Sequence, residues 1–179
     1  MAGQAVAVRG ASPDDLGDLG LVDTSYRTDR IYRVRRSELG FWLDEERIDP
    51  PVHKTNPPPQ LELGNGLFVA CVGTELVGYA ELLFEAWNGR ARIEHIYVSG
   101  GFRGRGVGRA LIQAVDERAR QEPDARCLWL ETQNVNFPAV QFYQRMGFQL
   151  CGLDESLYRP GDPALLPGEV ALYFSRDLA

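Results

Sequence analysis

The segment Arg103-Gly-Arg-Gly-Val-Gly-Arg109 places three glycines at alternate positions between two runs of different periodicity. The preceding run, 93–98, is rich in β-branched residues and is typical of a strand, whereas 110–119 has apolar residues at helical spacing. A glycine-rich turn between a strand and a helix N-terminus exposes backbone N–H groups, and the helix dipole adds partial positive charge there. The backbone of 103–109 is therefore predicted to bind a pyrophosphate.

The two common nucleotide motifs do not match this turn. The dinucleotide fingerprint opens the first βαβ unit of a chain, whereas several strands are expected before Arg103 here. The lysine of a nucleotide-binding P-loop is also missing. By itself, the turn is also compatible with a structural turn that carries solvated arginines.

A second pattern follows later in the chain. It reads Asn136-x-x-Ala139-x-x-Phe142-Tyr143-x-x-x-Gly147-Phe148. With both patterns in this order, the sequence from 67 to 174 resembles the GNAT superfamily of acetyl-coenzyme A dependent N-acetyltransferases. The resemblance implies acetyl-CoA as cosubstrate and direct transfer to an amine in a ternary complex, without a covalent enzyme intermediate.

The resemblance also implies which groups hold the coenzyme. The glycine turn would wrap the pyrophosphate, and backbone groups of the strand before it would pair with the pantetheine arm and polarise the acetyl carbonyl. The helix that begins near Asn136 would supply further contacts. The residues implied are Ile96, Tyr97, Val98, Arg103, Gly104, Arg105, Gly106, Val107, Gly108, Arg109, Asn136, Ala139, Phe142 and Tyr143.

A closer resemblance concerns the acceptor. Trp87-Asn88, Ile93-Glu94, Leu130-Glu-Thr-Gln-Asn134 and Gly168-Glu-Val-Ala-Leu-Tyr173 look like the streptothricin acetyltransferase group. That group acetylates the β-lysine amine of a cationic antibiotic, which implies a small cationic amine as substrate and antibiotic resistance as a role. Alternatives are a protein or peptide N-acetyltransferase, a catalytically silent acetyl-CoA binding module, and a chain that acts mainly as an interaction partner.

Glu94 is the candidate general base. An alkyl ammonium has a pKa near 10.4, so only about one molecule in 10³ to 10⁴ is a free nucleophile at pH 7. Strand alternation would place Glu94 on the same face as Ile96 and Val98, from where it could accept the substrate proton directly or through a water. The alternative is a solvated carboxylate or a partner of Arg92.

Tyr143 is the candidate general acid, because the resemblance implies that its hydroxyl approaches the coenzyme sulfur and protonates the departing thiolate. The alternative is an aromatic side chain whose ring packs in the core. Asn136 is either a helix cap or a coenzyme contact. A further group of residues could line an anionic mouth for a charged amine: Glu81, Glu85, Trp87 and Glu131. Any one of them could instead be an ordinary surface residue.

These groups require a mixed α/β (α+β) fold. The expected sheet has six to seven strands, with an antiparallel front and a parallel splayed centre, flanked by about four helices in one domain spanning 1–179. Helices are expected at Ser12-Pro13, over 30–46, over 108–121 and over 136–146. The Pro-rich segment 49–60 is predicted to be a loop or flap, since prolines cannot continue a helix.

The composition limits which classes of partner and which cellular location are expected. A net charge of −6 and a pI near 5 disfavour nucleic acid, whose phosphates need clustered Lys and Arg. The three cysteines form no CxxC pair, so neither a disulfide framework nor a metal site is expected. No apolar leader or membrane segment is recognised, which favours a cytoplasmic protein, and the bias toward Arg suggests a bacterial source. The family resemblance makes a homodimer an option.

Overall fold

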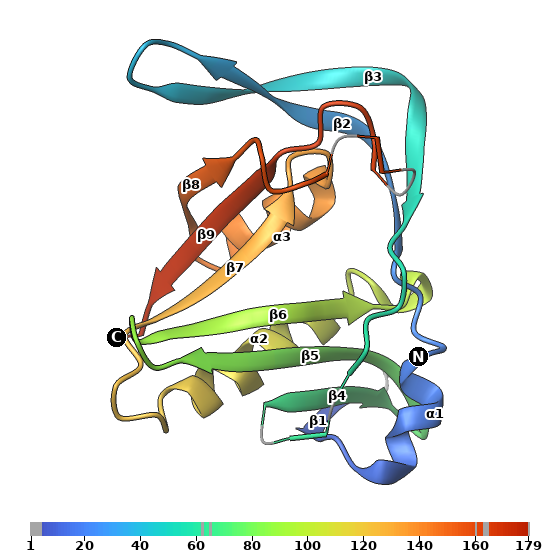
Figure 1. Cartoon of the computed structure of the whole chain (residues 1–179). Coiled ribbons are helices and arrows are strands. Elements are labelled where there is room, and N and C mark those ends of the chain that lie inside the picture. Colours follow the sequence, from blue (N-terminus) through green and yellow to red (C-terminus); the bar gives the residue numbers. More distant parts are fainter. Residues whose placement is uncertain (1–4, 62, 65, 160, 163–164, 179) are drawn as a thin grey trace. The chain divides into compact units, whose positions relative to one another are not determined.

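The computed structural model describes residues 5–61, 63–64, 66–159, 161–162 and 165–178. The chain forms two compact units, each assembled from separate segments (Figure 1). The first unit comprises Met1–Thr24, Pro57–Leu130 and Arg176–Ala179, and the second comprises Ser25–Asn56 and Glu131–Ser175. Within the described residues, no helix is both long and apolar enough to cross a membrane.

The first unit is a meander of antiparallel strands followed by one parallel crossover. Its antiparallel strands, adjacent in this order, are β1 (Val6–Gly10), β4 (Leu67–Val72), β5 (Glu75–Glu85) and β6 (Arg90–Val98). Helix α2 (Val107–Ala119) then leads to β7 (Cys127–Gln133), which pairs in parallel with β6. The predicted antiparallel front of the sheet and the parallel pairing that follows it are confirmed.

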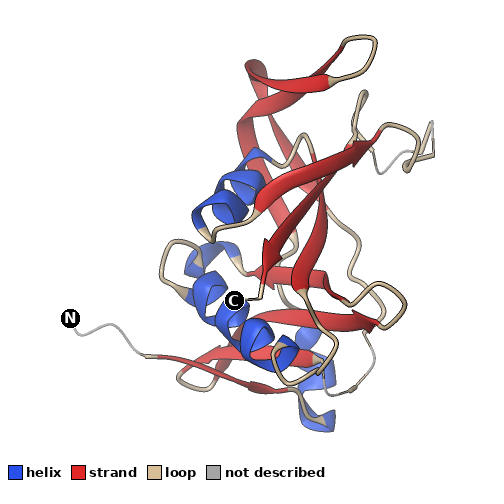
Figure 2. Cartoon of the chain, turned by 90° about the vertical axis from the view of Figure 1, so that its left-hand side faces the viewer, coloured by secondary structure: helices blue, strands red, loops and turns tan. Residues whose placement is uncertain are grey.

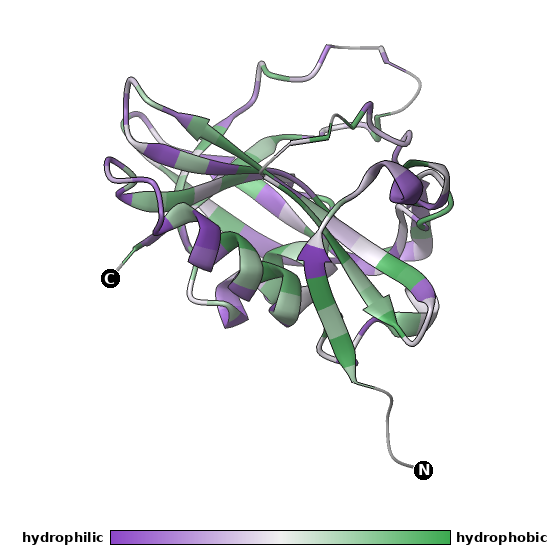
Figure 3. Cartoon of the chain, turned by 90° about the horizontal axis from the view of Figure 1, so that it is seen from below, coloured by the Kyte–Doolittle hydropathy of each residue, from purple (hydrophilic) through white to green (hydrophobic). Residues whose placement is uncertain are grey.

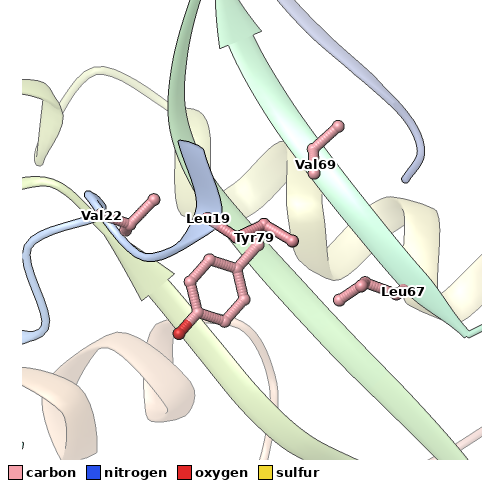
Figure 4. Packing of buried hydrophobic residues seen from close by; sticks show 5 residues of the cluster. All are labelled: Leu19, Val22, Leu67, Val69 and Tyr79. Carbon is pink, nitrogen blue, oxygen red and sulfur yellow. The ribbon is translucent and has the colours of Figure 1, made fainter. Parts of the chain in front are cut away.

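Both faces of this sheet are covered. On one face, a cluster joins the short helix α1 (Leu16–Leu19) and the residues after it to β4 and β5, as Figure 4 shows; its members are Leu19, Val22, Leu67, Val69 and Tyr79. Helix α2 packs its apolar stripe against the sheet and turns its polar residues outward, and both kinds are visible along it in Figure 3. The core of the first unit therefore fixes β5, β6 and the start of α2.

The second unit contains the other strands and helix α3. Strands β2 (Ser25–Arg36) and β3 (Phe41–Thr55) form a long antiparallel ribbon (Figure 2). Strand β8 (Gln149–Asp154) pairs antiparallel with β9 (Ala171–Asp177), which neighbours β7, and α3 spans Phe137–Arg145. The neighbour order β1-β4-β5-β6-β7-β9-β8 gives a seven-stranded mixed sheet, and the predicted fold class is confirmed.

The helix expected over 30–46 is wrong, because this stretch belongs to the ribbon of β2 and β3. Its charges pair across the two strands rather than at helical spacing. Arg30 binds Glu45, and Arg33 places two guanidinium nitrogens on the Glu46 carboxylate at 3.0 and 2.7 Å. Cross-strand pairs of opposite charge stabilise a ribbon, and β-branched and aromatic residues favour strands over helices.

The loop expected over 49–60 is wrong for 49–55, which continues β3. The prolines are tolerated there because the ladder between β2 and β3 is interrupted between Thr28 and Arg30. Thr28 pairs with Val52 and Arg30 pairs with Arg47, so Pro50 and Pro51 lie in the interrupted part of the ladder, where no backbone N–H is required. The Asp49–Pro50 peptide bond is cis.

Candidate active site

The glycine turn joins the short 3-10 turn Gly100–Phe102 to helix α2. Gly104 and Gly106 have φ values of 74° and 88°, in the left-handed region that disfavours other residues. Gly106 is the N-cap of α2, so the first N–H groups of the helix follow it directly. No atom lies within 4 Å of a Cβ built on either glycine, which leaves open space over the backbone for a bound anion.

Side chains tie the turn to the end of β6. The Arg103 Nε donates to the Val98 carbonyl at 2.7 Å, and an Nη donates to the Asp23 carbonyl at 3.2 Å. The Arg105 guanidinium lies over the Phe102 ring, 5.4 Å from its centroid. Arg103 therefore stabilises the turn, and the backbone of the turn with the N-terminus of α2 fits the pyrophosphate of coenzyme A.

Gly106→Val is expected to raise the KM for acetyl-CoA roughly tenfold, because a β-branched residue cannot keep this left-handed φ and the first N–H groups of α2 would be redirected. Steady-state kinetics with acetyl-CoA varied would measure the change. Gly73→Val is the matched control, since Gly73 has a φ of 62° in another turn. An acetyl-CoA KM that rises equally in both variants would contradict the prediction.

Strand β6 continues past its ladder with β7. The parallel pairing covers Arg90–Ile93 of β6 and Cys127–Leu130 of β7 and ends there. Beyond this point Ile96, Tyr97 and Val98 pair with β5 on the other side of the strand. After Ile93, the backbone groups on the side of β6 away from β5 are thus outside the described ladder to β7. These groups are the ones expected to pair with the pantetheine arm.

Glu94 lies at a β-bulge of β6. Glu81 pairs with His95, but the next residue of β5, Leu82, pairs with Ile93, so Glu94 is the extra residue of β6. The alternation that was expected to place Glu94 on the face of Ile96 and Val98 is therefore interrupted. Its carboxylate contacts Arg92, two residues earlier on the same strand, which confirms the alternative of an Arg92 partner, while its role as a base stays a prediction.

Carboxylates of β5 and β6 take cationic or polar partners in this unit. Arg92 lies 2.5 Å from a Glu94 oxygen and 3.1 Å from a Glu85 oxygen, and the Glu81 carboxylate lies 3.8 Å from the His95 ring nitrogen. Burial lowers the pKa of His95, and the charge of Glu94 opposes that shift. Trp87, in the turn between the two strands, is 86% exposed.

In the second unit, the Asn136 side chain accepts a hydrogen bond from the Ala139 N–H at 3.3 Å, so its expected role as the cap of α3 is confirmed. Tyr143 is buried, and its ring packs near those of Phe142, Phe148 and Phe174, at centroid distances of 5.4, 5.9 and 6.3 Å. This confirms the packing role of Tyr143, whereas its acid role stays a prediction.

Sequence reasoning missed two polar pairs of the second unit. The Tyr158 hydroxyl donates to Glu131, and burial together with that carboxylate raises the pKa of Tyr158. The Lys54 ammonium donates to both oxygens of Glu169, at 2.6 and 2.7 Å, and both side chains are buried. The one available signal was that Lys54 is the only lysine of the chain.

In this mixed sheet, β6 extends beyond its described ladder with β7 and is followed by a glycine turn and a helix N-terminus, which is the arrangement expected of an acetyl-CoA dependent N-acetyltransferase. The chain belongs to the acetyltransferase (GNAT) family, whose profile matches residues 28–148. Acetyl-CoA is its cosubstrate.

The relatives narrow the group within the family. The chain is 39% identical to the streptothricin acetyltransferase of Streptomyces lavendulae, over 97% of this chain and 95% of that protein. It is 30% identical to a streptothricin acetyltransferase of Escherichia coli, over 90% and 91% of the two chains. The solved structure of nourseothricin acetyltransferase superposes with a TM-score of 0.88 at 39% identity, over 98% and 99% of the two chains.

Proposed function

We propose that this N-acetyltransferase acts on a primary amine of a small cationic substrate of the streptothricin type. The observation that carries the proposal is the set of carboxylates on the paired strands β5 and β6, where Glu81, Glu85 and Glu94 lie in the unit that also contains the glycine turn. Carboxylates attract an ammonium substrate, and a streptothricin acetyltransferase is 39% identical to this chain over nearly its full length.

Acetyl-CoA supplies an acetyl group activated as a thioester. The backbone of 103–109 would hold the pyrophosphate, and β6 would align the pantetheine arm. Glu94 would bind the substrate ammonium and accept its proton, directly or through a water, so that the amine becomes a nucleophile. Glu131 would add negative charge for further cationic groups of the substrate, and Trp87 would offer an exposed aromatic surface.

Tyr143 would donate a proton to the departing thiolate. A thiol has a pKa near 8.5, so the thiolate can leave without full protonation. Tyr143→Phe is therefore expected to lower kcat by roughly tenfold rather than abolish activity, a modest loss on the scale of general acid catalysis. The ring contacts remain in this variant, so thermal stability should stay close to that of the parent. Undiminished kcat in thiol-release assays would remove the acid role.

The direct experiment is to incubate the purified protein with acetyl-CoA and a panel of streptothricin, aminoglycosides, polyamines and peptides, while thiol release is followed. Streptothricin should have the highest kcat/KM, and mass spectrometry should locate the acetyl group on its β-lysine amine. A preference for peptides would identify a protein N-acetyltransferase instead. Binding of acetyl-CoA without turnover of any amine would identify a catalytically silent module.

A further inference from the structure

Arg92 lies between two carboxylates on the strand that carries the proposed base. Its Nη1 is 2.5 Å from Glu94 Oε2, and its Nε is 3.1 Å from Glu85 Oε1. All three side chains are about two thirds buried, with exposed fractions of 33% for Arg92, 31% for Glu94 and 26% for Glu85. A charge contact with this burial is screened less by solvent than one on an open surface.

Glu85 is itself held at the turn between β5 and β6. The Asn88 side chain donates to the other oxygen of Glu85 at 3.0 Å, and its own oxygen accepts the Arg90 N–H at 2.9 Å. The Arg126 Nε donates to the Asn88 carbonyl at 2.7 Å. The turn therefore anchors Glu85, and two ion pairs run from Glu85 through Arg92 to Glu94, although the buried Arg92 Nε makes no hydrogen bond to any described residue at its 3.1 Å approach to Glu85.

The bulge explains why Glu94 needs such support. As the extra residue between Ile93 and His95, Glu94 has no partner in the ladder to β5, so no residue of β5 stands directly opposite it to pack against its side chain. Arg92 contacts one carboxylate oxygen, and a carboxylate has lone pairs on both. The second oxygen therefore keeps capacity to accept a proton while the first is held.

We propose that Arg92 is a positioning residue for the acetyl transfer: it holds Glu94 in its working orientation from the anchor that Asn88 and Glu85 provide. The proposal rests on the proposed function, because it requires Glu94 to act on the amine. It gives Glu85 a structural task in place of direct contact with the substrate. It also predicts that lysine cannot replace Arg92, since an ammonium lacks the planar fork that reaches two carboxylates.

The first measurement compares Arg92→Met with the parent enzyme in steady-state kinetics with streptothricin and acetyl-CoA. We expect kcat to fall roughly tenfold, the size expected when a charge-assisted contact is lost, while the KM for acetyl-CoA stays unchanged. Arg92→Lys should not restore kcat, and Glu85→Gln should cause a smaller fall. Arg90→Met is the matched control, because Arg90 lies on the same strand and packs over Trp129 rather than on Glu94.

The second measurement repeats the Arg92→Met substitution in a Glu94→Gln background. There it should change kcat by less than about twofold, because the effects of residues that act through one another are not additive. Thermal melting identifies variants that fail to fold, and Arg92→Gln then replaces Arg92→Met. Unchanged or raised kcat in Arg92→Met, or an equal fall in both backgrounds, would overturn the positioning role. An active, unimpaired Glu94→Gln enzyme would instead overturn the proposed base and this inference together.

Discussion

Glu94→Gln is expected to lower kcat/KM for the amine substrate by roughly 10² to 10⁴, the range that general base catalysis contributes. Glutamine keeps the size and shape of the side chain but cannot accept a proton from the ammonium. The KM for acetyl-CoA should stay close to that of the parent, because the glycine turn and α2 hold the coenzyme. Thiol-release kinetics at pH 7 measure both quantities.

The defect of Glu94→Gln should shrink as the pH rises. The pKa of an alkyl ammonium is near 10.4. Below that value, each rise of one pH unit gives about tenfold more free amine, which attacks without an enzyme base. Activity of the variant should therefore approach that of the parent toward pH 9 to 10, on the scale of that pKa. Glu117→Gln, at an exposed position of α2, is the control. An equal defect at every pH would contradict the base role.

Lys54→Met is expected to lower the free energy of unfolding by about 3 to 5 kcal/mol, the cost of breaking a buried ion pair by removing one partner. The Lys54 and Glu169 side chains are only 7% and 1% exposed, so water cannot replace the lost ammonium. The remaining bond to Glu169, from the Leu166 N–H at 2.8 Å, does not balance its charge. Urea denaturation followed by circular dichroism measures the loss.

A second substitution separates the charge from the packing. In Lys54→Met with Glu169→Leu, both charges are gone and apolar side chains fill the site, so much of the lost stability should return. Arg30→Met, which breaks the half-exposed pair with Glu45 in the same ribbon, should cost at most about 1 kcal/mol. If Lys54→Met cost no more than this control, the buried pair would not be the stabilising contact.

Asn134 joins distant segments of the second unit, a structural role that no local sequence pattern predicted. It is 1% exposed, and its side chain accepts the Val170 N–H at 2.7 Å and donates to the Tyr32 carbonyl at 2.8 Å. With Lys54 and Glu169, it ties the ribbon of β2 and β3 to the segment that leads into β9. These partners are far apart in sequence, so only the folded chain brings them together.

Local patterns were sufficient where one periodicity dominated. The helical spacing of α2 follows directly from side-chain burial, and this helix was predicted over 108–121, within two residues of its observed bounds Val107–Ala119. The helix prediction for 30–46 was wrong because the apolar residues of this stretch are sparse enough to fit helical spacing loosely. Its charges decide for a ribbon only through partners on the opposite strand, such as Arg33 and Glu46.

The sequence by itself determined the donor class, because the glycine turn at 103–109 and the pattern from Asn136 to Phe148 together indicate an acetyl-CoA dependent family, and the geometry of such a turn is local to its own residues. Only the tertiary structure decided the strand register and the buried contacts. The bulge at Glu94 depends on the register with β5, and the buried pair of Lys54 and Glu169 depends on packing between distant segments. Register and burial arise from contacts across the chain, so no local run of residues specifies them.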